Sequence, residues 1–228
     1  EGREPMKKLW HNSSWESAIR DIPGQAQNLK ERFHRKRVTE IVFTGCGSSY
    51  YSSLTASAIF QALSGIRARG LPASELFLFS DSFLTKGGFT LLVAISRSGE
   101  TTETIQAVQT FRDRYSGNTL GVSCYENSRL TSECDINLIA KEAKEESIVQ
   151  TRSFTTMLLM LELYAGIISE QANFYSQLSA LPEQGRRIVN EYRDLVKELG
   201  EKKEIEKFVI LGSGANYGLA CEAMLKLK

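Results

Sequence analysis

Two apolar runs of this 228-residue chain each stop at a glycine-containing turn crowded with hydroxyl side chains, and each turn leads into a helical pattern. Residues 41–53 read IVFTGCGSSYYSS, and residues 91–104 read LLVAISRSGETTET. Backbone N–H groups at a helix N-terminus, together with nearby hydroxyls, form a favourable site for an anion, most often a phosphate. The two turns therefore predict a phosphate site shared between two neighbouring strands.

Strand-like and helical patterns alternate through the middle of the chain. Strand-like runs occur at 40–44, around 66–70, and at 90–95, 119–124 and 135–140, and helical patterns at 50–63, 101–115 and 128–134. Strands that are apolar throughout and separated by helices indicate a parallel sheet covered on both faces. We expect a three-layer α/β domain with five parallel strands, with the two hydroxyl-rich turns at the carboxyl ends of its strands.

Further helices flank this unit. Apolar residues recur at spacings of three and four from Trp15 to Phe33, and Pro23-Gly24 is expected to break or kink that helix into two pieces. The helix expected at 153–171 is apolar on nearly every side, which fits a core position and a dimer contact equally well. A second helix is expected from near Pro182 to Gly200, with Ile188, Tyr192, Leu195 and Leu199 on one face.

The end of the chain repeats the first glycine-containing turn. FVILGSGANY at 208–217 aligns without a gap on IVFTGCGSSY at 41–50, at a constant offset of 167 residues. Each copy predicts an apolar strand and a G-x-G turn, and the second copy runs into a helix over 218–228. A repeat in register predicts a second unit of the same fold.

Composition gives no sign of a polyanionic or membrane partner. Lys and Arg total 28 against 27 Asp and Glu, and the basic run at 30–37 is more typical of the solvated end of a helix than of a nucleic-acid site. The longest apolar stretch, 154–169, is short for a membrane span and contains Glu162. We expect a cytoplasmic protein that binds no metal, nucleic acid or membrane. Four cysteines without CxxC spacing are typical of reduced thiols: Cys46, Cys124, Cys134 and Cys221.

Four segments together resemble the tandem sugar isomerase (SIS) domain family. They are GCGSSYYSS at 45–53, SRSGETTET at 96–104, ESIVQTRSFTT at 146–156 and GSGANYGLACEAMLKLK at 212–228. The likeness is to phosphosugar aldose–ketose isomerases and deaminases, including the isomerase half of glutamine–fructose-6-phosphate aminotransferase. It implies a flavodoxin-like five-stranded parallel sheet in each SIS domain, two domains per chain and a homodimer.

The resemblance also implies a division of the chain. We expect an N-terminal helical segment at 1–37, a first SIS domain at 38–175, a linker helix at 176–204 and the start of a truncated second SIS domain at 205–228. The implied activity is that of a phosphosugar isomerase or aminosugar-phosphate deaminase that needs no cofactor. A non-catalytic sugar-phosphate sensor is the alternative. The 228 residues alone are not expected to be active, but are expected to bind phosphate-bearing sugars weakly.

Carried over motif by motif, the resemblance implies a set of site residues for a hexose or hexosamine 6-phosphate. The residues implied around the phosphate and sugar are Ser48, Ser49, Ser96, Arg97, Ser98, Thr101 and Gln150. Glu222 and Lys226 are implied near the sugar ring as catalytic residues, with the main base beyond Lys228.

Each motif also has a purely structural explanation. Ser98 could cap a helix, with Gly99 relaxing the turn, but this leaves the hydroxyls of Ser96 and Thr101 unexplained. Glu222 and Lys226 are four residues apart, so a plain surface ion pair is an equal alternative.

Overall fold

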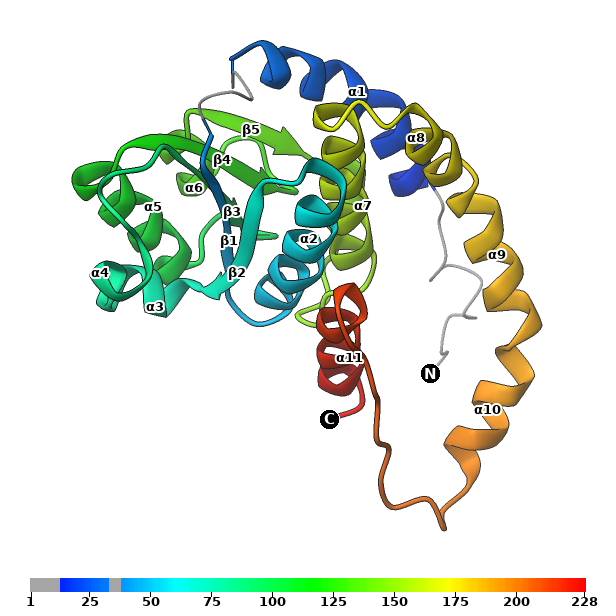
Figure 1. Cartoon of the computed structure of the whole chain (residues 1–228). Coiled ribbons are helices and arrows are strands. Elements are labelled where there is room, and N and C mark those ends of the chain that lie inside the picture. Colours follow the sequence, from blue (N-terminus) through cyan, green and yellow to red (C-terminus); the bar gives the residue numbers. More distant parts are fainter. Residues whose placement is uncertain (1–12, 33–37) are drawn as a thin grey trace.

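The computed structural model describes residues 13–32 and 38–228, and a five-stranded parallel sheet forms its centre (Figure 1). The strand order is β2-β1-β3-β4-β5, so the direction of strand addition reverses between β1 and β3. This is the flavodoxin-like order, and the predicted α/β sheet is confirmed. The strands are β1 (Glu40–Gly45), β2 (Arg67–Pro72), β3 (Thr90–Ile95), β4 (Gly117–Ser123) and β5 (Ile136–Ile139).

Helices cover both faces of the sheet. Because successive strand residues point to opposite faces, Ile41 and Phe43 of β1 enter the core beneath α1, α2 and α7, while Val42 enters the core beneath α3, α5 and α6. Every residue of β1 and β3 is buried, as their apolar runs require. The covering elements are α1 (Ser13–Arg32), α2 (Ser48–Ser64), α3 (Ala73–Leu78), α4 (Ser80–Phe83), α5 (Thr102–Arg114), α6 (Arg129–Glu133), η2 (Lys141–Ala143) and α7 (Arg152–Ile168).

The apolar helix predicted at 153–171 is α7, and it lies in the core of the described chain between α1 and α2 (Figure 1). The ring of Tyr164 is 5.5 Å from that of Phe60, which in turn is 5.0 Å from the ring of Phe43 in β1. This burial explains the composition of α7 without a partner subunit. In the described part of the chain, no helix is long and apolar enough to cross a membrane.

The predicted break at Pro23 is wrong, because α1 continues through it as one helix. A proline inside a helix removes a hydrogen bond and costs about 3 kcal/mol. Burial of Ala18, Ile22 and Ala26 on both sides of the proline keeps the helix intact. The first twelve residues and residues 33–37, which complete the basic run, lie outside the described residues.

The single helix predicted from Pro182 to Gly200 is two helices, α9 (Leu181–Glu191) and α10 (Arg193–Glu201). Only Tyr192 separates them, and its N–H still donates to the Ile188 carbonyl at 3.0 Å. A further helix, α8 (Ala172–Leu178), was not predicted. Figure 1 shows α9 and α10 leading away from the sheet as an arm, after which the chain returns to α11 (Ala215–Lys226).

The C-terminal repeat keeps its turn but not its strand. Gly47 before α2 has φ 54° and ψ −126°, and Gly214 before α11 has φ 55° and ψ −130°. The strand predicted from Phe208 is not formed, because no other strand of the described chain pairs with it; Val209 is 73% exposed and Leu211 is 89% exposed. The helix α11 begins three residues before the predicted start and packs on α2.

The four cysteines are unpaired, and two of them are buried. Burial raises the pKa of the Cys124 and Cys134 thiols to about 12, so both are protonated at neutral pH. Cys46 is half-buried, and burial also raises its pKa. A thiol in these surroundings is a poor nucleophile.

Candidate functional site

The two hydroxyl-rich turns lie beside each other at the point where the strand order reverses. Strands β1 and β3 pair in parallel with Thr44 opposite Ala94, so the turns that follow them leave the same edge of the sheet. Helices α2 and α5 cover opposite faces of the sheet, and their N-termini lie at this one edge, where Cys46 Sγ of the β1 turn is 3.8 Å from Oγ1 of Thr104 in α5. Sheets of this class bind their ligands there.

The turn after β1 packs tightly against the first turn of α2. A Cβ atom on Gly45 would lie 2.7 Å from the Cβ of Ser49 and 2.8 Å from the carbonyl oxygen of Ile95, so glycine is required. Gly47 adopts a positive φ, which glycine also favours. Ser48 and Ser49 are thereby buried at the start of α2, which no side chain caps.

Ser96 is the centre of the turn after β3. Its Oγ accepts a hydrogen bond from the Gly99 N–H at 3.1 Å and lies 2.9 Å from Oγ1 of Thr101. Ser98 does not cap α5, because its Oγ accepts instead from the Glu100 N–H at 3.1 Å. Thr101 directly precedes α5 and makes no side-chain cap bond. The N-terminus of α5 therefore has no side-chain cap.

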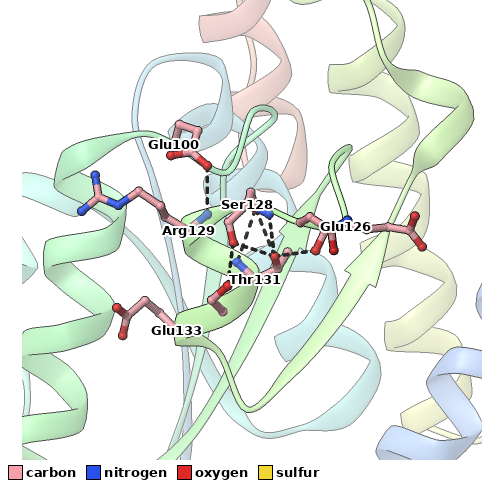
Figure 2. A pocket seen from close by; sticks show the side chains of 8 residues that line it. Glu100, Glu126, Ser128, Arg129, Thr131 and Glu133 are labelled. Atoms are coloured by element: carbon pink, nitrogen blue, oxygen red, sulfur yellow. Dashed lines mark hydrogen bonds between the residues drawn. The ribbon is translucent and has the colours of Figure 1, made fainter.

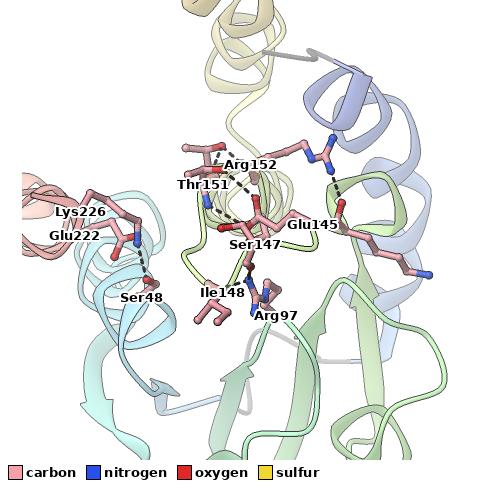
Figure 3. Close-up of polar contacts among 12 residues, drawn as sticks. Ser48, Arg97, Glu145, Ser147, Ile148, Thr151, Arg152, Glu222 and Lys226 are labelled. Carbon is pink, nitrogen blue, oxygen red and sulfur yellow. Dashed lines mark hydrogen bonds and ion pairs between the residues drawn. The ribbon is translucent and has the colours of Figure 1, made fainter. Parts of the chain in front are cut away.

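Helix α11 brings a charged pair to the β1 turn, as Figure 3 shows. Lys226 Nζ donates to Ser48 Oγ at 3.1 Å and lies 2.5 Å from Oε1 of Glu222. The side chains of Glu222 and Lys226 are only 7% and 23% exposed. The i,i+4 ion pair considered as an alternative is thus present, but it lies against a hydroxyl of the candidate site.

Arg97 points at the loop between η2 and α7 (Figure 3). Its Nη1 donates to the carbonyl oxygens of Ser147 at 2.5 Å and Ile148 at 3.3 Å. Gln150 lies at the end of this loop, and its Oε1 is buried without a hydrogen-bond partner. The loop that carries Gln150 is therefore attached to the β3 turn through Arg97.

Glu145 is a residue of this region that the sequence motifs did not identify. Its carboxylate accepts hydrogen bonds from the N–H and hydroxyl of Thr151 and from the hydroxyl of Ser153. Burial raises the pKa of Glu145, but these hydrogen bonds outweigh the effect and hold it below its usual range. The sequence signal that could have identified Glu145 is an acidic residue shortly before a Thr and a Ser at the start of an apolar helix, where a carboxylate can accept hydrogen bonds from the helix N-terminus.

A pocket of about 430 Å³ adjoins the β3 turn on the side of α6 (Figure 2). The Arg129 N–H donates to Oε1 of Glu100 at 2.9 Å across it. A Cβ on Gly99 would lie 2.0 Å from Ser128 Oγ, so the turn packs directly against this pocket's wall. Because Glu100, Glu126 and Glu133 line it, this pocket is poorly suited to a phosphate.

A model of the SIS domain matches residues 35–166, which is more than half of the chain. The chain belongs to the SIS domain family. Curated relatives include the glutamine–fructose-6-phosphate aminotransferase (isomerizing) of Methanosarcina acetivorans, 30% identical over 218 residues, and that of Chlamydia caviae, 32% identical over 200 residues. These matches cover 91% and 83% of this SIS chain, which spans about a third of the length of those relatives.

Solved structures share the SIS fold. Tagatose-6-phosphate ketose/aldose isomerase from Escherichia coli is similar with a TM-score of 0.83 at 19% identity, over 95% of this chain and 60% of that one. Glucosamine-6-phosphate deaminase from Thermotoga maritima is similar with a TM-score of 0.68 at 29% identity, over 93% of this chain and 66% of that one.

Proposed function

We propose that this SIS chain carries the phosphate-binding turns and part of the sugar-binding site of a phosphosugar aldose–ketose isomerase or an aminosugar-phosphate deaminase. The observation that carries the proposal is that two helix N-termini without side-chain caps lie at the same edge of the sheet, at its switch point. The hydroxyls of Ser48, Ser49, Ser96 and Thr101 surround them. The names of the relatives supply the substrate class, a sugar phosphate.

The physical chemistry of this site suits a phosphate. A phosphate monoester carries about −1.5 to −2 charges at pH 7, and each hydrogen bond to a charged group contributes about 1.5–3 kcal/mol. The N-termini of α2 and α5 supply backbone N–H groups and positive dipole ends, which an anion complements. Ser98 remains part of the proposed phosphate site, because it lies in the same turn between Ser96 and Thr101.

Isomerisation of a sugar phosphate moves a proton between two adjacent carbons through an enediol. It requires a base above those carbons, a polar group for the developing oxyanion and a distant anchor for the phosphate. The turns are proposed as the anchor, and Glu222 and Lys226 as groups near the ring. The family resemblance implies a separate main base, which is not among the residues proposed for this site.

We keep the expected division of the chain as part of the proposal. The matching backbone angles at Gly47 and Gly214 support the view that 205–228 begin a second unit, with 38–175 as the first SIS domain and 176–204 as the linker. The N-terminal segment expected at 1–37 lies partly outside the described residues. A homodimer is proposed from the family resemblance, and a cytoplasmic location from the composition.

The test is a calorimetric titration of the chain with fructose 6-phosphate, glucose 6-phosphate and free glucose. Both phosphates are expected to bind with a Kd near 1 mM, about −4 kcal/mol, and glucose not to bind. A double substitution, Ser98→Ala with Thr101→Val, is expected to weaken both at least tenfold. Thr102→Val on the exposed first residue of α5 is the matched control. Binding of glucose as strong as that of its phosphate would refute the proposal.

An assay of a longer chain distinguishes an enzyme from a non-catalytic sensor. Extended through the second unit, it is expected to interconvert an aldose phosphate and a ketose phosphate, or to release ammonia from glucosamine 6-phosphate. Binding without either reaction would favour the non-catalytic alternative.

A further inference from the structure

The loop at 145–151 between η2 and α7 is held by polar contacts instead of side-chain packing. Ile148 at its tip is 91% exposed and Val149 is 52% exposed, so neither anchors the loop in a core. Two groups hold its backbone instead. Arg97, which belongs to the β3 turn, donates to the carbonyl oxygens of Ser147 and Ile148. Glu145, the first residue of the loop, accepts from the N–H of Thr151 at its other end.

Glu145 closes the loop on itself. Its Oε1 accepts from the Thr151 N–H at 3.0 Å and its Oε2 from Thr151 Oγ1 at 2.9 Å, and Ser153 Oγ donates to the same carboxylate. The Glu145 side chain is only 7% exposed. Thr151 directly precedes α7 and supplies no cap from its own side chain, so Glu145 takes that role.

The same carboxylate faces the guanidinium of Arg97. Glu145 Oε1 lies 3.9 Å from Arg97 Nη1, whose side chain is 22% exposed. One partly buried carboxylate therefore lies beside the charge of Arg97 and also holds the far end of the loop whose carbonyl oxygens Arg97 binds. Figure 3 shows these groups converging from the β3 turn and from the start of α7.

We infer that Glu145 is a positioning residue of the proposed phosphosugar site. It holds the 145–151 loop beside the β3 turn, so that the buried, unpartnered Oε1 of Gln150 can accept a hydrogen bond from the part of the ligand beyond its phosphate. Of the residues implied around the phosphate and sugar, it faces Arg97, whose guanidinium binds the loop backbone, and it does not contact the hydroxyls of Ser96, Thr101 or Ser48. Loss of Glu145 should therefore affect recognition of the sugar and spare recognition of the phosphate. This inference rests on the proposed function.

The experiment compares two probes, inorganic phosphate and fructose 6-phosphate, by calorimetric titration of the same 228-residue chain. The unsubstituted chain is expected to bind fructose 6-phosphate about fivefold more tightly than phosphate, the value of one net hydrogen bond. Glu145→Ala is expected to reduce this ratio to about one, with the Kd for phosphate changed less than twofold. Glu145→Gln keeps an acceptor oxygen of the same reach, and is expected to restore part of the ratio.

Glu146→Ala is the matched control, because the neighbouring Glu146 is exposed and is expected to leave the ratio unchanged. Thermal unfolding checks that each variant folds, and Glu145→Gln carries the comparison if Glu145→Ala does not. The inference is overturned if the variants keep the full ratio, if both affinities fall together, or if the unsubstituted chain does not discriminate the probes. If the unsubstituted chain binds neither probe, the proposed function itself fails.

Discussion

At the scale of single residues, helix α7 carries two polar groups in apolar surroundings, Tyr164 and Glu162. Tyr164 OH is buried without a hydrogen-bond partner among the described residues, and burial raises its pKa. Glu162 lies on the same helix and lines a pocket of about 150 Å³ between α1, α7, α9 and α11. Each group lowers stability in a way that a single substitution can measure.

Tyr164→Phe is expected to raise the free energy of unfolding by about 1 kcal/mol. The substitution removes a buried hydroxyl that has no partner and keeps the ring that packs on Phe60. Tyr175→Phe is the control, since the Tyr175 hydroxyl donates to the Ile19 carbonyl at 3.2 Å, and its loss should lower stability by a similar amount. Urea unfolding measures both, and a loss of stability in Tyr164→Phe would contradict the expectation.

Glu162 is expected to make the chain less stable as the pH rises. Burial raises its pKa from 4.5 to about 7, and among the described residues no other ionisable side chain lines its pocket. The folded state therefore holds a proton that the unfolded state releases between these values, so the contribution of Glu162 to stability is most favourable below pH 4.5 and falls by about 3 kcal/mol as the pH rises through 7. Urea unfolding of Glu162→Gln and the unsubstituted chain at pH 5 and pH 8 should show a difference that depends on pH. A difference that is equal at both pH values would count against a raised pKa.

At the scale of elements, the helix α11 depends on one glycine for its place on α2. A Cβ on Gly218 would lie 2.4 Å from both the Tyr51 carbonyl oxygen and Thr55 Oγ1. Thr55 Oγ1 also donates to the Ala215 carbonyl at 3.0 Å, which fixes the start of α11. The contact of Lys226 with Ser48 follows from this docking.

Gly218→Ala is expected to displace α11 from α2, although alanine favours helices. Amide hydrogen exchange of α11 should become faster, and the thermal midpoint should fall by a few degrees, as for a loss of about 1 kcal/mol. Gly200→Ala in α10 is the control, because a Cβ there meets no atom within 4 Å and should be neutral or stabilising by up to about 1 kcal/mol. Unchanged exchange in Gly218→Ala would mean that the two helices have room to adjust.

The elements also differ in how well the sequence predicts them. β3 is predicted to the residue, since a buried apolar run bounded by turns has few other conformations. The short helices α3 and α4 are missed because ASELFLFSDSF at 73–83 has no clear period. The run at 208–211 has the pattern of a strand, but a strand needs a partner, and none of the described strands pairs with it.

The residues of the candidate site also differ in how well the sequence predicts them. The hydroxyls of Ser48 and Ser96 follow directly from the turns that end two strands, so the sequence identifies them. The role of Glu145 depends on a loop that folds back onto Thr151, and the approach of Lys226 to Ser48 joins residues 178 positions apart. Such contacts have no local pattern, because docking of whole elements creates them.

At the scale of the whole molecule, the chain is one complete sheet unit followed by an arm and a returning helix (Figure 1). The stripe formed by Ile188, Tyr192, Leu195 and Val196 is exposed along the arm. Residues 203–214 between α10 and α11 form neither helix nor strand, and most of them are exposed. Helices α9 and α10 and the connecting residues 203–214 therefore contribute little to the stability of the sheet unit.

Trypsin is expected to make its first cut within the described residues at Lys202, Lys203 or Lys207, which are exposed between α10 and α11. The larger product should keep the far-ultraviolet circular dichroism of the sheet unit and a cooperative thermal transition, since both cores lie N-terminal to the cut. Mass spectrometry identifies the site. First cleavage inside the sheet unit, or loss of cooperative unfolding after a cut in the arm, would show that the two parts depend on each other.

The glycines before α2 and α11 have one more consequence. Their backbone angles, 54° and −126° at Gly47 and 55° and −130° at Gly214, are the mirror image of an extended conformation that any L-residue adopts readily. At these two positions the backbone adopts a conformation that D-amino acids favour, and glycine fits because it is achiral. In a chemically synthesised chain, D-alanine at both sites would match the backbone of the two turns, where L-alanine would strain it.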